Sequence, residues 1–222
     1  MARLKIHSVT QILLLVVVCV TSAVIGFALR NNNASDPKPN QPSTLQQSDE
    51  KVIDRQRNQN EPFEISDLSV QSTNVLLGET LDVRKLPESR DWLKDLQFTI
   101  KNKSDKQITY FIYSLRFPQA LIHGGQLLHP MDVGSPPSPL RSITENKPLV
   151  IKPEDKFKVA LPDKELTLIY KVLSREGLNL ADLTKVTLRI EAIIYEGGMK
   201  WDGGHWYKPN LNEPGKYERI DQ

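Results

Sequence analysis

The chain has 222 residues and a formal net charge of +2 at pH 7. Both excess positive charges, on Arg3 and Lys5, lie near the N-terminus, and the remainder holds 27 basic and 27 acidic residues. Nucleic-acid binding requires a basic surface that neutralises phosphates, so the neutral remainder argues against that function. The only cysteine is Cys19, so no disulfide is expected. This composition fits a bacterial envelope protein better than a small eukaryotic secreted domain.

Residues 9–29 predict a transmembrane signal-anchor helix. The run from Val9 to Leu29 is apolar apart from small or weakly polar residues, and 21 helical residues rise roughly 30 Å, the thickness of a bilayer's hydrocarbon core. The basic residues before it predict a cytoplasmic tail at 1–8 and a periplasmic or extracellular position for the rest of the chain. A cleaved signal peptide is the alternative, because small residues at 21–23 and 26–28 suit cleavage. The run is longer than an ordinary signal core of roughly 7–15 residues, which favours the anchor.

Residues 30–61 predict a flexible linker. Positions 31–61 hold eleven Asn or Gln residues, three prolines and few apolar residues. Such a segment buries too little apolar surface to offset its ordering entropy. A random coil of this length reaches roughly 30 Å on average. A short helix over Ser48–Arg57 is the alternative, and residues 62–222 are then the β-rich ectodomain.

Period-two alternation predicts the first strands of the ectodomain. Apolar residues at alternate positions predict strands at 63–70 and 96–101, and the polar run Asn102–Lys106 predicts a hairpin turn after the second. The segment Ile108–Phe117 is apolar on both faces, which predicts a central strand. A further strand is expected at Ala120–Leu128, with a bulge or bend at its paired glycines.

The rest of the ectodomain continues this pattern around one helix. A Pro/Ser-rich loop at about 130–148 precedes a predicted strand at Lys156–Leu161, and a long alternating strand is predicted at Val186–Ile194. Between these two strands, an amphipathic helix is predicted over about 164–176, ending at Gly177. Its apolar stripe comprises Leu166, Ile169, Tyr170 and Leu173.

Seven or eight strands and one helix predict an immunoglobulin-like antiparallel β-sandwich. The helix is expected to cross from one sheet to the other. The cysteine–tryptophan–cysteine signature of antibody domains is absent from the sequence, so the prediction concerns only the architecture.

Two pairs of glycines organise the C-terminal segment. The first pair, 197–198, suits a two-residue hairpin turn, because glycine accepts positive φ at both positions. In that register Ile194 faces Trp201. Since Ile194 belongs to the core-facing row of its strand, Trp201 is predicted to point into the core.

The candidate ligand or partner contacts are His205, Trp206 and Tyr207, which follow the second glycine pair. Clustered aromatic side chains with polar tips suit stacking on sugar rings or anchoring a peptide. The structural alternative is that Trp206 or Tyr207 closes the open end of the sandwich. The long loop Asp132–Asn146 is a further candidate, either as a proline-rich partner-binding segment or as an inert connection.

No catalytic, cofactor-binding or metal site is predicted. The sequence after the anchor has no cysteine, no Gly-x-Ser-x-Gly elbow and no Gly-x₄-Gly-Lys phosphate loop. The possible metal ligands lack the spacing of a known ligand pair. They are His123, His129, Asp132, Asp202 and His205.

This arrangement resembles a group of uncharacterised bacterial envelope proteins that have an N-terminal membrane anchor and an immunoglobulin-like β-sandwich ectodomain. The matching elements are Ile100–Tyr110, Leu166–Leu173 and Ile193–Tyr217. The closing pattern Trp-x-Gly-Gly-x-Trp/Tyr…Pro-x-x-x-x-Pro-Gly-x-Tyr is the most specific of them. The resemblance implies localisation and fold. The group has no assigned activity, so the resemblance implies no functional residues.

The expected function is therefore a membrane-tethered, extracytoplasmic module without catalytic activity that binds another envelope protein or organises an envelope complex. Residues 9–29 are expected to contact the lipid bilayer. The alternative function is a carbohydrate- or cell-wall-binding module that uses the C-terminal aromatic residues.

Overall fold

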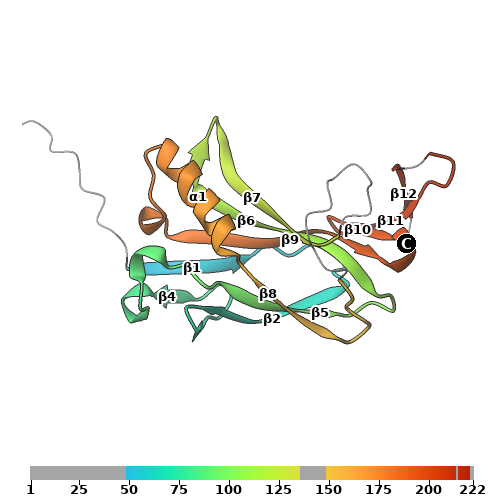
Figure 1. Ribbon diagram of the computed structural model, residues 1–222, viewed down its shortest axis with the longest axis horizontal. Helices are drawn as coiled ribbons and strands as arrows, with labels where there is room; N and C mark the ends of the chain where they lie inside the picture. The colour runs from blue at the N-terminus through green and yellow to red at the C-terminus, as the bar shows by residue number, and fades with distance from the viewer. Residues whose placement is uncertain (1–48, 136–148, 214, 221–222) are drawn as a thin grey trace, which may run out of the picture. The chain divides into compact units, whose positions relative to one another are not determined.

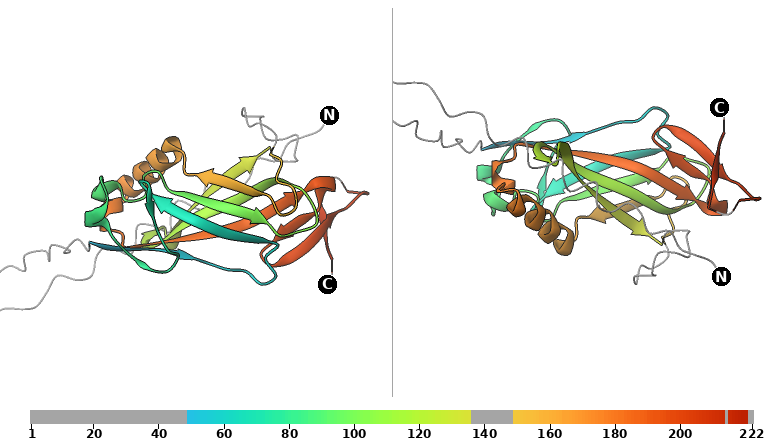
Figure 2. Two further views of the ribbon diagram at one scale, coloured as in Figure 1. Left: turned by 90° about the horizontal axis from the view of Figure 1, so that it is seen from below. Right: turned by 90° about the horizontal axis from the view of Figure 1, so that it is seen from above.

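The computed structural model describes residues 49–135, 149–213 and 215–220, which form a mainly β domain with two sheets and one α-helix (Figures 1 and 2). The larger sheet, sheet A, contains β1 (Glu50–Arg55), β4 (Thr80–Asp82), β6 (Ile108–Ile122), β7 (Gly125–Gly134), β9 (Lys185–Tyr195), β10 (Lys200–Asp202), β11 (His205–Pro209) and β12 (Tyr217–Ile220). Sheet B contains β2 (Phe63–Val70), β3 (Thr73–Asn74), β5 (Gln97–Asn102) and β8 (Lys156–Ala160). The helix is α1 (Asp163–Arg175), and short 3-10 helices span Val83–Lys85, Ser89–Asp91, Leu180–Asp182 and Glu196–Gly198.

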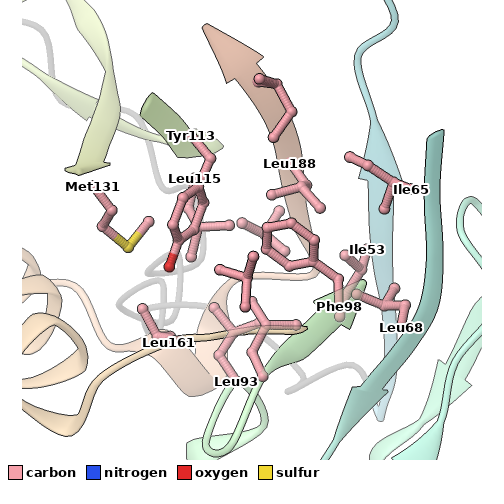
Figure 3. Close-up of a cluster of buried hydrophobic side chains, with 14 of the residues drawn as sticks. Ile53, Ile65, Leu68, Leu93, Phe98, Tyr113, Leu115, Met131, Leu161 and Leu188 are labelled. Atoms are coloured by element: carbon pink, nitrogen blue, oxygen red, sulfur yellow. The ribbon is translucent and has the colours of Figure 1, made fainter. Parts of the chain in front are cut away.

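A single apolar core lies between the sheets. Figure 3 shows Phe98 and Leu68 of sheet B among Leu115 and Leu188 of sheet A, and all four side chains are buried. Buried and more exposed residues alternate along β2 and along the first half of β9, as expected for strands with one face on a core. The predicted architecture is confirmed at the level of two sheets and one helix that connects them. The prediction that all strands are antiparallel is wrong, because β1 pairs in parallel with β9.

The strand β9 is central to sheet A. It pairs with β6 along one side; on its other side, the first half pairs in parallel with β1 and the second half pairs antiparallel with β10. The strands β10, β11 and β12 then form an antiparallel meander that ends the chain.

The predicted linker over residues 30–61 is wrong at its C-terminal end. Residues Glu50–Arg55 form β1, with Lys51 and Ile53 buried, so neither linker nor helix describes them. The segment that follows is held by hydrogen bonds from the backbone N–H of Asn58 to Glu61 (2.8 Å) and from Arg189 to the Asn58 side chain (3.3 Å). The strand β1 was not predicted because its sequence is polar. Its pairing partners, β4 and β9, are distant in sequence, so local spacing gives no sign of them.

The predicted hairpin turn at Asn102–Lys106 is also wrong. It connects β5 of sheet B to β6 of sheet A, so the chain crosses between sheets here. The buried side chain of Asn102 stabilises the crossing, because its Nδ2 donates to the carbonyls of Lys106 (2.7 Å) and Ile151 (3.0 Å). Its Oδ1 accepts from the backbone N–H of Ser104 (3.0 Å).

The strand predicted at Ala120–Leu128 is instead a hairpin. Ile122 pairs with Gly125, and the turn residues His123 and Gly124 have φ of +49° and +82°, as in a type I′ turn. The irregularity lies earlier in β6, between Phe117 and Leu121. The strand β7 continues to Gly134, so the predicted loop at 130–148 begins later, and its residues 136–148 lie outside the described part.

The predicted register after β9 is wrong by one residue, although Trp201 is buried as expected. The turn has three residues, and Trp201 pairs with Ile193 rather than with Ile194. A bulge at Glu191, between the pairs Ile112–Ala192 and Tyr113–Ile190, switches which face of β9 points inward. The bulge and the longer turn each change which face of the strand points inward. Their effects cancel, so the Trp201 side chain still points into the core.

The helix α1 agrees with the prediction to within one residue at each end. Three residues of the predicted apolar stripe, Leu166, Ile169 and Leu173, are buried, and the fourth, Tyr170, is half-buried. At its C-terminus, the N–H of Leu178 donates to the carbonyl of Leu173 and the N–H of Gly177 to that of Ser174, which is the Schellman arrangement.

The cytoplasmic tail predicted at 1–8, the anchor predicted at 9–29 and the linker up to residue 48 lie outside the described residues. Among the residues that the structure describes, none of the helices is long and apolar enough to cross a membrane.

Candidate functional site

The three predicted contact residues do not form one aromatic surface. They lie in β11, and because adjacent residues of a strand point to opposite faces, Trp206 points away from His205 and Tyr207. Trp206 pairs with the buried Trp201 and packs on the ring of Tyr195, with centroids 5.1 Å apart and planes inclined by 34°. Trp206 is half-buried, so it combines core packing with partial exposure.

The contacts of Tyr207 indicate a structural role. The Lys200 Nζ lies 6.0 Å from the centroid of the Tyr207 ring and 5.6 Å from that of Tyr217, and it also pairs with Asp202 at 2.5 Å. These cation–π contacts join β10, β11 and β12 on one face of the meander. Tyr207 therefore stabilises the meander.

His205 and Trp206 do line a common cleft of about 250 Å3 at the end of the meander. The His205 Nδ1 accepts a hydrogen bond from Arg219 Nη2 at 2.7 Å, which requires the imidazole proton to be on Nε2. The other walls come from the connection after β1 and from β12. Besides His205 and Trp206, the cleft is lined by Gln59, Asn60, Gly204, Arg219 and Ile220.

Sequence reasoning missed Gln59, Asn60 and Arg219. The two amides fell within the predicted linker, and no element was predicted at Arg219. Gly204 brings the two segments together: its φ is +99°, and a Cβ there would lie 3.2 Å from the backbone oxygen of Gln59. The Gly203-Gly204 pair was the one sequence signal of this close approach.

A second hollow, a groove of about 260 Å3, runs between the outermost strands of the two sheets. It is lined by Met131–Val133 of β7 and Phe157–Ala160 of β8. Consecutive residues of a strand point to opposite faces of its sheet. Because consecutive residues of β7 and of β8 all line the groove, the groove runs along the edges of these strands and not over one face. At its base lie Tyr113 and Met131, which Figure 3 shows beside one another at the border of the core. Burial raises the pKa of Tyr113, so its hydroxyl remains a hydrogen-bond donor.

The edge of β8 beside this groove is open. Leu161 N–H donates to the Leu96 carbonyl at 2.8 Å, and Asn102 N–H donates to the Asp155 carbonyl at 3.1 Å. Hydrogen-bonded and non-hydrogen-bonded pairs alternate in an antiparallel ladder, so the odd-numbered residues of β8 bond to β5. The backbone N–H and C=O groups of the even-numbered residues point to the other side, where no described strand pairs with β8. These residues are Lys156, Lys158 and Ala160, all exposed.

The charge along this edge is positive. Neither Lys156 nor Lys158 has an ion-pair partner among the described residues. The groove itself also contains carboxylates: Glu165 lies 2.9 Å from His129 Nε2, and Asp132 accepts a hydrogen bond from the Tyr110 hydroxyl at 2.6 Å. The groove therefore combines an apolar base, lysines along β8, carboxylates on β7 and α1, and the outward backbone groups of β8.

The possible metal ligands identified in the sequence are dispersed. His129 faces Glu165, Asp202 pairs with Lys200, and His205 pairs with Arg219. Within residues 49–135, 149–213 and 215–220, no three His, Cys, Asp or Glu side chains are grouped as metal ligands.

Comparisons with protein-family models, with curated proteins and with solved structures gave no match for this chain.

Proposed function

We propose that this chain is a membrane-tethered, extracytoplasmic protein-interaction module without catalytic activity, which docks an extended segment of an envelope protein. The observation that carries the proposal is the open edge of β8 beside the groove. An extended peptide added to this edge would satisfy the outward N–H and C=O groups of Lys156, Lys158 and Ala160. Strand addition of this kind takes affinity from main-chain hydrogen bonds and specificity from pockets for alternate side chains.

The groove provides such a pocket. Alternate side chains of an added strand would point between the sheets, toward Tyr113 and Met131, which are almost fully buried and largely apolar. Each large apolar side chain removed from water contributes about 1.5–3 kcal/mol. The Tyr113 hydroxyl adds one directional contact at the base.

The charge of the edge selects the partner. Exposed lysines on an edge strand discourage pairing with unrelated strands. Acidic side chains in the added segment would instead be attracted to these lysines. Such charge complementarity raises the specificity and the association rate of binding. We therefore propose a partner segment with an apolar residue flanked by Asp or Glu.

The location is part of the proposal and rests on the sequence. The apolar run at 9–29 supports a single-pass anchor with residues 1–8 in the cytoplasm, and the shortened linker would begin at residue 30 and end before β1. The resemblance to bacterial envelope proteins supports the same localisation.

We also propose that the sandwich is immunoglobulin-like. The antiparallel order β2-β5-β8 in sheet B corresponds to strands A, B and E of that architecture. The antiparallel order β7-β6-β9-β10 in sheet A corresponds to C′, C, F and G.

The test is site-specific photo-crosslinking of the full-length protein in its native membrane, followed by mass spectrometry of the crosslinked segment. The crosslinker is placed at Lys156 or Lys164 beside the groove and, as a control, at the exposed Leu76 in another part of the domain. We expect one recurrent acidic, extended segment at the groove positions and its absence at the control position.

Two substitutions at Lys158 distinguish binding by strand addition, which needs the backbone N–H, from binding by charge attraction alone. Lys158→Pro removes an outward N–H without disturbing the bonds to β5, whereas Lys158→Ala removes only the charge. We expect Lys158→Pro to abolish the crosslink and Lys158→Ala to weaken it. A crosslink that survives Lys158→Pro unchanged would exclude strand addition at β8.

A further inference from the structure

We infer that the segment docked beside β8 is the C-terminus of the partner, which runs parallel to β8 and places its free carboxylate at the first turn of α1. This inference deepens the proposed function and rests on strand addition at β8. Three observations support it: pairing along β8 stops at a proline, the first turn of α1 has backbone N–H groups without acceptors, and a buried tyrosine hydroxyl in the groove has no partner.

An added strand can pair with β8 only as far as Ala160. The next outward-facing position is Pro162, which has no backbone N–H. Directly after Pro162 the chain turns into α1, and Lys164 and Glu165 of its first turn line the same groove. A strand that continued past Ala160 would meet this turn, which favours a segment that ends here over one that passes through.

The first turn of α1 has two unused donors. The Pro162 carbonyl accepts from the N–H groups of Glu165 (2.9 Å) and Leu166 (3.1 Å), and no side chain caps the helix. Among the described residues, the N–H groups of Asp163 and Lys164 have no acceptor. Free N–H groups and the helix dipole attract a carboxylate and repel an ammonium group. The C-terminus of a peptide therefore suits this end of the groove, and its N-terminus does not.

The acidic side chains of this turn do not occupy the two donors. Glu165 Oε2 lies 2.9 Å from His129 Nε2 of β7, and the exposed side chain of Asp163 makes no capping hydrogen bond. Both carboxylates reduce the positive potential of the turn. Binding therefore depends on directed hydrogen bonds to the N–H groups and not on net charge, which decides the design of the test.

Tyr113 is an independent sign of a ligand. Its side chain is only 1% exposed, and its hydroxyl has no hydrogen-bond partner among the described residues. It lines the groove, and Figure 3 shows the hydroxyl on the side of Leu161, which precedes the first turn of α1 by two residues. Burial, and to a smaller extent the charge of Glu165, raise the pKa of Tyr113, so the hydroxyl keeps its proton and can donate it to a carboxylate. Leaving such a buried donor unpaired costs free energy, which a bound carboxylate would recover.

The parallel orientation also gives a consistent register. Val159 lies at the level of Tyr113, because Phe98 pairs with Val159 and its ring packs on Tyr113 with centroids 5.3 Å apart. A C-terminal residue beside Val159 points into the groove, and the residues beside Lys156 and Lys158 point outward with these lysines. The sequence Glu-Val-Glu-Leu with a free C-terminus thus places both acidic side chains beside lysines and both apolar side chains in the groove.

The experiment is calorimetric titration of the full-length protein in detergent micelles with the peptide acetyl-Glu-Glu-Val-Glu-Leu in three forms. One form has a free C-terminus, the second has a C-terminal amide, and the third is extended by Gly-Gly, which keeps the terminal charge but moves it. We expect the free form to bind about tenfold more tightly than either of the others.

Two substitutions at Asp163 form a matched pair. Asp163→Pro removes the first N–H of α1 and preserves the helix, because proline is favoured at the first helical position, whereas Asp163→Ala removes the same charge and keeps the N–H. Tyr113→Phe removes only the hydroxyl. We expect Asp163→Pro and Tyr113→Phe each to weaken the free peptide about fivefold without affecting the amide, and Asp163→Ala not to weaken either.

The outcomes separate this inference from the proposed function. Equal affinity for the three forms overturns the inference, and if that binding is lost in Lys158→Pro, strand addition stands without recognition of a terminus. A preference for the free form that survives Lys158→Pro contradicts strand addition and leaves the carboxylate site. Binding of none of the peptides also overturns the inference, and the crosslinking experiment in the native membrane then tests strand addition separately.

Discussion

The ring of Phe63 in β2 meets the indole of Trp201 in β10 edge to face, with centroids 5.3 Å apart and planes inclined by 81°. This contact joins sheet B to the first strand of the C-terminal meander. Trp201 has no exposed surface, so its whole side chain attaches the meander to the core, alongside the partly buried Trp206.

Trp201→Ala is therefore expected to destabilise the domain by about 3–5 kcal/mol, the usual cost of truncating a buried aromatic residue. Urea denaturation measures the change. Lys208→Ala, an exposed position in the adjacent strand β11, is the control and should lie within about 0.5 kcal/mol of the wild type. A small effect of Trp201→Ala would mean that the meander does not unfold cooperatively with the sandwich.

Asn102→Ala is expected to cost about 3 kcal/mol, since each buried polar group left unpaired costs about 1–3 kcal/mol. The variant loses bonds to Lys106, Ile151 and Ser104 at the crossing between the sheets. Thermal unfolding compares it with Asn74→Ala, an exposed residue of β3. Equal melting temperatures for the two variants would contradict this role of Asn102.

Lys51 provides a test by pH. It is fully buried in β1, with Nζ donating to the Ala181 carbonyl at 2.6 Å, and desolvation lowers its pKa from the ordinary value of 10.5 while Asp182 and Asp49 partly offset this. Between the lowered folded-state pKa and 10.5, the unfolded chain binds more protons than the folded chain, so the free energy of unfolding rises with pH.

The difference in unfolding free energy between wild type and Lys51→Met isolates this effect. The wild type should gain stability relative to Lys51→Met as the pH is raised from 7 toward 10.5. Urea titrations at several pH values measure the gain. Lys208→Met, at an exposed position, should show no such trend, and a pH-independent difference for Lys51→Met would refute the prediction.

Gly204→Ala and Gly124→Ala form a matched pair. Both positions have positive φ, at +99° and +82°, so both substitutions should cost about 1–2 kcal/mol in backbone strain. Only at Gly204 would the new Cβ meet another segment, 3.2 Å from the Gln59 oxygen, whereas nothing lies within 4 Å at Gly124. Gly204→Ala should therefore be the less stable of the two by about 1 kcal/mol or more, as seen by denaturation. Equal stability of the two variants would contradict the close approach of Gly204 to Gln59.

Local periodicity predicted the elements whose stability depends on one buried stripe. The helix α1 and the strands β2, β5, β8 and β9 were found because their core residues recur at the spacing of a helix or a strand. The burial of Trp201 was also predicted, although the register was wrong and a bulge corrected it. A bulge depends on the partner strand, which local spacing does not reveal.

Long-range pairing accounts for the errors. The strand β1 has the composition of a linker and is ordered by neighbours far along the chain, and the polar run at 102–106 has the composition of a hairpin turn although it changes sheets. The candidate cleft shows the same limit: His205 and Trp206 were identified as aromatic candidates, whereas Gln59, Asn60 and Arg219 join them only through the tertiary fold. The open edge of β8 likewise follows from sheet order, which no short motif encodes.

The parallel pairing of β1 with β9 has a mechanical consequence. In a chain anchored through residues 9–29, as we propose, tension enters the domain at the start of β1 and is directed along that strand. Because β1 is bonded to β9 on one side and to β4 on the other, the force acts on several hydrogen bonds at once in shear instead of opening them one after another. The strand at the point of attachment would thus resist extraction, and a load on a docked partner would reach the membrane with the sandwich still folded.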